Sequence, residues 1–137
     1  MAIDIKMLNR LRRTSKAHWE AEAENPQPIV VMSKDPEGCD AMMEAFRTIA
    51  SEMGLRHAHL CLVDGFTDEH QKMLDRKGPR IVTITDIDGY PQEELPSLNE
   101  KVAKGSRTLV ACLIHAPEED IPQLAEAWRT MQKHRQE

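Results

Sequence analysis

The sequence predicts a small three-layer α/β/α domain with a mainly parallel four-stranded sheet and an extra N-terminal helix. Two observations support this fold class. Short, almost continuously apolar segments alternate along the chain with segments whose apolar residues recur at helical spacing. Continuously apolar strands are typical of parallel sheets whose two faces are both covered by helices. The 137 residues are enough for one such domain with a real core.

The first expected helix covers about residues 3–24 and precedes the α/β pattern. Its apolar residues Ile5, Leu8 and Leu11 are three apart and share a helix face. The prolines in residues 25–28 end this helix, because proline cannot continue a helix. We therefore divide the chain into a basic amphipathic helix (1–25) and an α/β domain (28–137), and the helix either packs on that domain or reaches out to a partner.

Four strands and four helices are expected in the α/β part, and each crossover between parallel strands should be right-handed. The strands are expected at Ile29–Met32, about His57–Val63, Arg80–Thr85 and Thr108–Ile114. The helices are expected at about Gly38–Met53, Thr67–Arg76 and about Glu93–Ala103, and from near Glu118 to the C-terminus. Thr67 is a suitable N-cap, and Gly54, Gly78 and Gly105 follow helices as stop signals. The edges of so small a sheet need protection, which a homodimer would provide.

Charge is unevenly distributed along the chain. The net charge of −5 argues against general nucleic-acid binding, yet residues 1–17 carry +4 and the remainder −9. A basic arm on an acidic body could contact an acidic protein, or nucleic acid through this helix alone. A solvated helix face is the simpler alternative. Arg10, Arg12, Arg13 and Trp19 are the expected partner-binding residues.

Several protein classes are not indicated. The longest apolar runs fall short of the ~18 residues of a membrane span, and the N-terminus lacks the apolar stretch of a signal peptide. The odd number of cysteines does not indicate a disulfide framework. Cys61 and Cys112 lie in apolar strands, where cysteine usually acts as a small buried hydrophobe. We expect a soluble cytoplasmic protein without a membrane partner.

The carboxyl ends of the predicted strands are where a ligand would bind, because parallel α/β sheets bind ligands at that edge. A phosphate-binding P-loop reads G-x-x-x-x-G-K-[ST] at this strand-to-helix position. Here only Gly38 is retained; Ser33 replaces the first glycine, Cys39 the lysine and Asp40 the hydroxyl residue. The candidate ligand-binding residues at this edge are Ser33, Lys34, Asp35, Gly38, Cys39, Asp86, Asp88 and His115.

Two later segments extend this pattern. Residues 84–91, Ile-Thr-Asp-Ile-Asp-Gly-Tyr-Pro, resemble the region after a Walker B strand in AAA+ ATPases, and residues 113–118 resemble the sensor-1 turn of that family. The resemblance implies Thr85 at the magnesium-binding aspartate, Asp86 at the catalytic glutamate and His115 at the sensor asparagine. It also implies that strand four lies beside strand one. Without the lysine and the Walker B aspartate, the resemblance implies a scaffold that no longer hydrolyses nucleotide.

A second resemblance competes. Response-regulator receiver domains also place an aspartate after the third strand, here Asp86, but need paired acids, a hydroxyl and a lysine at positions that this chain does not supply. That resemblance implies that strands two and three lie beside strand one. It also implies a receiver-like scaffold that no longer carries out the chemistry of that family.

Three functions follow as hypotheses. The first is a non-catalytic protein-interaction or adaptor module without cofactor or metal. The second is an enzyme or ligand-binding protein that uses a phosphate or divalent ion at the strand ends, with the residues Asp35, Asp86, Asp88 and His115 around it. The third is a thiol-redox protein that uses Cys39 just inside a helix N-terminus, where the helix dipole favours a thiolate; the missing C-x-x-C and the nearby acids oppose it.

Overall fold

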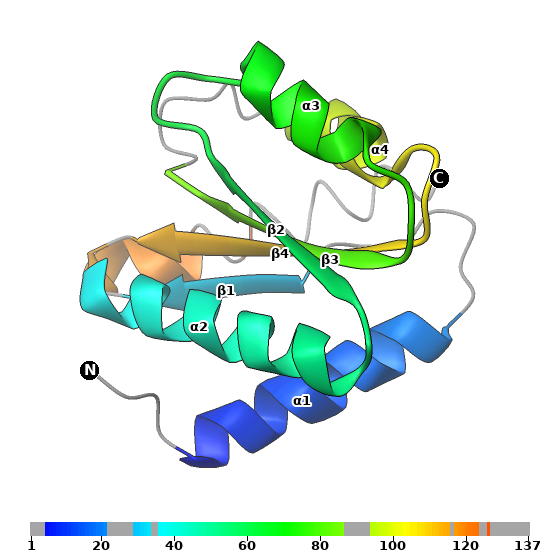
Figure 1. The fold of residues 1–137 in the computed structure, drawn as a ribbon. Helices are drawn as coiled ribbons and strands as arrows, with labels where there is room; N and C mark the ends of the chain where they lie inside the picture. Colours follow the sequence, from blue (N-terminus) through cyan, green and yellow to red (C-terminus); the bar gives the residue numbers. More distant parts are fainter. Residues whose placement is uncertain are drawn as a thin grey trace.

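Four parallel strands form one sheet in the order β1-β4-β3-β2 (Figure 1). The computed structural model describes residues 5–21, 29–33, 36–86, 94–115, 117–123 and 126. The strands are β1 (Ile29–Ser33), β2 (Arg56–Cys61), β3 (Arg80–Thr85) and β4 (Thr108–His115). β4 thus lies between β1 and β3, and β2 is the far neighbour of β3. The predicted fold class is confirmed.

Helices cover both faces of the sheet and make the three layers (Figure 1). The helices are α1 (Ile5–Glu20), α2 (Pro36–Glu52), α3 (Asp68–Asp75) and α4 (Leu95–Ala103). On one face, α1 and α2 pack over Ile81, Ala111 and Leu113. On the other face, α3 and α4 pack over Val82, Val110 and Cys112. Alternate residues of one strand therefore enter two separate cores, as the apolar strands predicted.

Most predicted elements agree with the structure to within a few residues. The second strand ends at Cys61 rather than at Val63, because the Leu62 amide still bonds to Thr85 but the Gly65 amide closes a turn onto Leu62. Thr67 caps α3 as expected: its side chain accepts from the His70 amide, and the His70 ring accepts from the Thr67 amide. The last expected helix begins with a 3-10 turn, Glu118–Asp120, and most of it lies outside the described residues.

The N-terminal helix α1 packs on the domain and does not reach away from it. Leu11 and Ser15 are buried against the core that α2 forms with the sheet. Arg12 binds Glu52 of α2 through two hydrogen bonds of 2.8 and 3.0 Å. Trp19 packs against the same core, and the Arg107 guanidinium lies 4.0 Å from its ring centroid. Of the two alternatives left open for this helix, the structure has the one in which it packs on the domain, because its apolar face covers an apolar surface.

One fully buried cation lies at the start of β3. The Arg80 side chain is 0% exposed and donates to the main-chain oxygens of Leu74, Arg76 and Val102 and to the Thr108 hydroxyl, at 2.9–3.2 Å. These acceptors belong to the C-terminal ends of α3 and α4 and to β4. Unpaired carbonyls and the negative end of the dipole make a helix C-terminus a favourable site for a cation. Arg80 therefore holds two helix ends against the sheet.

Among the described residues, no helix has the length and apolar character needed to span a membrane.

Candidate functional site

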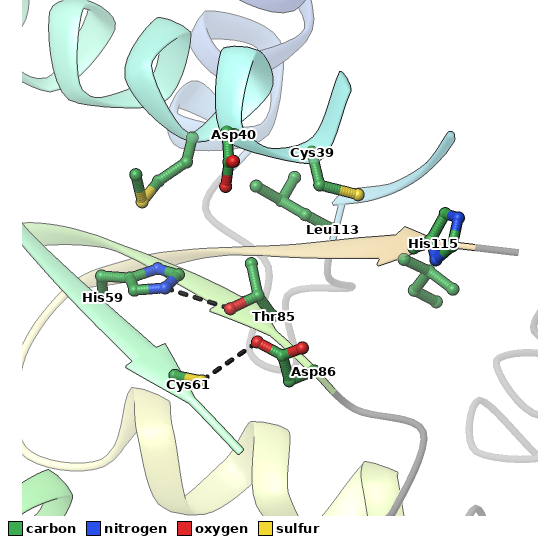
Figure 2. Close-up of a pocket in the computed structure, with 10 residues that line it drawn as sticks. Cys39, Asp40, His59, Cys61, Thr85, Asp86, Leu113 and His115 are labelled. Atoms are coloured by element: carbon green, nitrogen blue, oxygen red, sulfur yellow. Dashed lines mark hydrogen bonds between the residues drawn. The ribbon is translucent and has the colours of Figure 1, made fainter. Parts of the chain in front are cut away.

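A pocket of about 340 Å³ lies at the carboxyl edge of the sheet, beneath the first turns of α2 (Figure 2). Its walls come from four elements, α2, β2, β3 and the end of β4. The residues that line it are Cys39, Asp40, Met43, His59, Cys61, Thr85, Asp86, Leu113, Ile114 and His115. This volume is typical of a small-molecule site, where a few polar groups converge within an apolar surround.

Asp86 ends β3 in a backbone conformation that is rare for a residue with a side chain. Its φ is +55°, whereas the other described residues with positive φ are all glycines. Aspartate and asparagine tolerate this left-handed region better than most residues. The Cys61 thiol donates to Asp86 Oδ2 at 3.0 Å, across from the neighbouring strand. The carboxylate is thus held at the pocket while remaining exposed to solvent.

Cys61 accordingly differs from its expected role. It is half-buried and hydrogen-bonded at the end of the edge strand, because β2 stops there and its side chain faces the pocket. Cys112 does follow the expectation: it is 4% exposed, and burial raises the pKa of its thiol to about 12. None of the three cysteines forms a disulfide bond.

The strand-to-helix turn before α2 is packed differently from a phosphate cradle. A Cβ added to Gly38 would lie 2.2 Å from the Ser33 hydroxyl oxygen and 3.1 Å from its Cβ. Glycine is therefore required at position 38 because the Ser33 side chain occupies the space in front of the helix. In a P-loop, glycines allow the backbone to approach a phosphate. Here the retained glycine accommodates a side chain of the protein itself.

A chain of hydrogen bonds leads away from the pocket between β2 and β3. The buried Thr83 hydroxyl lies 2.9 Å from both His57 Nε2 and His59 Nδ1, and His59 Nε2 lies 3.1 Å from the Thr85 hydroxyl. A neutral imidazole has one donor and one acceptor nitrogen, so Thr83 can donate to one ring and accept from the other. Burial is the main cause that lowers the pKa of both histidines. For His59, Asp86 and Asp40 oppose this effect, while Arg47 and His70 add to it.

This network gives a prediction for pH. Because the pKa values of His57 and His59 are lowered in the folded state, the unfolded chain binds more protons below about pH 6.5, the ordinary histidine pKa. Their contribution to stability should be complete above that pH and should decrease as the pH falls toward the folded-state values. In urea unfolding at pH 7.5 and pH 5.5, the variant His57→Gln/His59→Gln should lose less stability on acidification than the wild type. His18→Gln, whose ring lies on α1, should behave like the wild type, and an identical loss in all three proteins would contradict this origin.

The structure brings together part of the predicted site. Cys39, Asp86 and His115 line the pocket, and Ser33 and Gly38 lie beside each other at the turn that precedes it. Lys34, Asp35 and Asp88 lie outside the described residues.

Sequence reasoning missed the contribution of β2. His57, His59 and Cys61 alternate along this strand and so share one face, which was the available signal. This face borders the pocket because β2 lies beside β3. The pattern of residues along one strand does not tell which strand is its neighbour.

Within the described part of the chain, no group of three or more histidine, cysteine, aspartate or glutamate side chains is arranged to hold a metal ion. The comparisons with known proteins give no match: no family model, no curated protein and no solved structure is similar to this chain at a significant level.

Proposed function

We propose that this chain is a non-catalytic binding and adaptor module on a degenerate nucleotide-binding-type α/β scaffold. One observation carries the proposal. The AAA+ resemblance assigns Cys39 to the phosphate-binding lysine, Thr85 to the magnesium-binding aspartate and Asp86 to the catalytic glutamate, and all three residues line the same pocket. Residues far apart in the sequence thus line one pocket, and Cys39 and Thr85 lack the ammonium and the carboxylate that the chemistry needs, whereas Asp86 keeps a carboxylate.

The strand order and the charge of the pocket add support. β4 lies beside β1, which is the arrangement that the AAA+ resemblance implied and the receiver resemblance did not. Asp40 and Asp86 both line the pocket, and no lysine or arginine is among the described residues that do so. Among the described lining residues, a nucleotide phosphate would meet two carboxylates and no lysine or arginine, which disfavours its binding.

A nucleotide titration tests this part of the proposal. ATP, ADP and GTP, each with and without Mg²⁺, should leave the melting temperature of the protein unchanged, and no phosphate should be released from ATP or GTP. A ligand present at about 100 times its dissociation constant adds about 2.7 kcal/mol of stability, so binding would be readily seen. A magnesium-dependent shift, or phosphate release that Asp86→Asn abolishes, would overturn the proposal.

The outer face of α1 is the proposed partner surface. Arg10 and Arg13 are exposed there and have no hydrogen bond or ion pair with another described residue. Arg12 is engaged with Glu52 and Trp19 packs on the core, so these two residues serve the fold. The remaining basic surface suits an acidic protein partner, because exposed charges on a rigid helix steer association.

Charge reversal on α1, compared with charge reversal at the end of α3, tests the proposed partner surface. Arg10→Glu/Arg13→Glu should unfold at the same urea concentration as the wild type but should lose the proteins that the wild type captures from its native cells. Arg76→Glu/Lys77→Glu, which reverses two exposed charges at the end of α3, should retain them. If both double variants keep the same captured proteins, the face of α1 is not the partner surface.

A second candidate function, small-ligand binding at the strand ends, is favoured by the pocket itself. Its volume of about 340 Å³ and its convergent polar side chains are the features of a ligand site.

A further inference from the structure

The chemistry of the pocket walls indicates the class of ligand that the pocket would accept. Figure 2 shows Asp40 projecting from α2 on one side, and Asp86 and Cys61 on the side of β3 and β2. Met43, Leu113 and Ile114 supply apolar surface in the same pocket. The pocket therefore offers two carboxylates on different elements together with an apolar surface.

Both carboxylates retain acceptor capacity. The only described hydrogen bond to Asp86 comes from the Cys61 thiol to Oδ2, and Asp40 has none with any described residue. A carboxylate accepts up to about four hydrogen bonds in total. The negative charges of Asp40 and Asp86 both act to raise the pKa of His59, whose ring lines the same pocket. A ligand between Asp40 and Asp86 would thus find unused acceptors on two sides.

No cation of the described chain lines this pocket. Arg47 acts on His59 in the opposite direction to the two carboxylates, and it is exposed and paired with Glu44 at 3.1 Å. The carboxylates lie on walls that different elements supply, and among the described residues no set of three ligating side chains can hold a metal ion. A bulky organic cation with several N–H donors fits this arrangement better than a compact inorganic ion, because it can reach both walls and cover the apolar surface.

We propose that the pocket binds a small organic cation, an aliphatic amine or guanidine, whose charged groups are held by Asp40 and Asp86. The aliphatic part of such a ligand would lie against Met43, Leu113 and Ile114. A guanidinium pairs well with a carboxylate because its N–H groups match the two oxygens. This assignment deepens the second candidate function and rests on it.

Calorimetric titration with agmatine, which carries a guanidinium at one end and an ammonium at the other, tests the assignment. We expect saturable binding to the wild-type protein at low ionic strength, weakened by up to about fivefold in Asp40→Asn and in Asp86→Asn, since an exposed ion pair contributes up to about that factor. Asparagine tolerates the φ of +55° at position 86, so Asp86→Asn should keep its fold. The matched control is Asp64→Asn, which removes an exposed acid that does not line the pocket, and should bind agmatine as the wild type does.

Further measurements distinguish a failure of the organic-cation site from a failure of the proposed function. Binding of agmatine should also shift the His59 ring resonances in NMR spectra, since His59 lines the same pocket as the two carboxylates. Absence of saturable agmatine binding, or equal weakening in Asp64→Asn, would overturn the assignment. Binding of Mg²⁺ alone that Asp86→Asn abolishes would overturn it as well. If ATP with Mg²⁺ binds and agmatine does not, both the organic-cation site and the proposed function are wrong. If neither agmatine nor any nucleotide binds, only the organic-cation site is wrong.

Discussion

Replacement of Arg80 by methionine is expected to lower the free energy of unfolding by about 3–5 kcal/mol. The guanidinium is the shared donor for three main-chain oxygens and the Thr108 hydroxyl, and it is fully buried. Methionine fills a similar volume but donates no hydrogen bond. The Leu74 and Val102 oxygens would lose the buried hydrogen bonds that Arg80 donates, whereas the Arg76 oxygen would keep the one from Arg56. Each buried acceptor left without a donor costs about 1–3 kcal/mol unless water reaches it.

This expectation differs from the one for a buried ion pair. When two buried charges pair with each other, replacing both with apolar residues is often neutral. The described partners of Arg80 are instead oxygens of the backbone and one hydroxyl, so no companion substitution can remove most of them. Burial and the nearby Arg56 lower the pKa of Arg80, but an arginine remains protonated in proteins.

Urea unfolding of three variants would measure the effect. Arg80→Met should show the full loss, and Arg80→Lys a smaller one, because an ammonium has three donors on one atom and cannot span the same set of acceptors. Arg76→Met removes the same charge from an exposed side chain four residues earlier and should change stability by less than about 0.5 kcal/mol. A loss in Arg80→Met no larger than in Arg76→Met would show that the buried contacts contribute nothing.

The second large effect is expected at Gly38, where alanine should destabilise the protein by about 1–3 kcal/mol. The direction of this change in stability distinguishes a steric clash from the ordinary effect of alanine in a helix. Within a helix, glycine to alanine normally stabilises by about 0.5–1 kcal/mol, because alanine loses less backbone entropy on folding. At this position the new methyl group would lie 2.2 Å from the Ser33 hydroxyl oxygen, so either the side chain or the first turn of α2 must move.

A double-mutant cycle identifies the contact responsible. Ser33→Gly removes both atoms that the new methyl group would meet. The combined variant Ser33→Gly/Gly38→Ala should therefore be more stable than the sum of the two single changes predicts, by about 1 kcal/mol or more, as is usual for residues in contact. Strict additivity, or a stabilising Gly38→Ala, would mean that the turn adapts without cost.

The sequence predicted the individual elements well because burial leaves a periodic pattern along the chain. The strand Arg80–Thr85 was predicted with the observed bounds, and the capping role of Thr67 was foreseen from its position before an acidic helical turn. Both properties depend on neighbours within a few residues. The sheet order β1-β4-β3-β2 could not be derived in this way, since periodicity reports which side of a strand is buried and not which strand lies beside it.

The features that the sequence did not predict also depend on which elements lie side by side in the fold. Arg80 looks like an ordinary charged residue at the start of a strand, because its acceptors come from two helices that only the fold brings together. The contact of Trp19 with Arg107 was not predicted because it joins residues 88 positions apart. The pocket was predicted at the right edge of the sheet from the rule for parallel strands, but the wall made by His59 and Cys61 depends on strand order.

The position of β4 between β1 and β3 has a consequence for the way the chain assembles. β1 is made first by the ribosome, yet the strand it pairs with in the described sheet is β4, whose register places Ile29 opposite Ala111. Until residues 108–115 have emerged, β2 and β3 can pair with each other while β1 has no neighbour to join. The first strand synthesised is therefore the last to be incorporated, and sheet closure must wait for contacts about 80 residues apart in sequence, the kind of long-range pairing that slows folding.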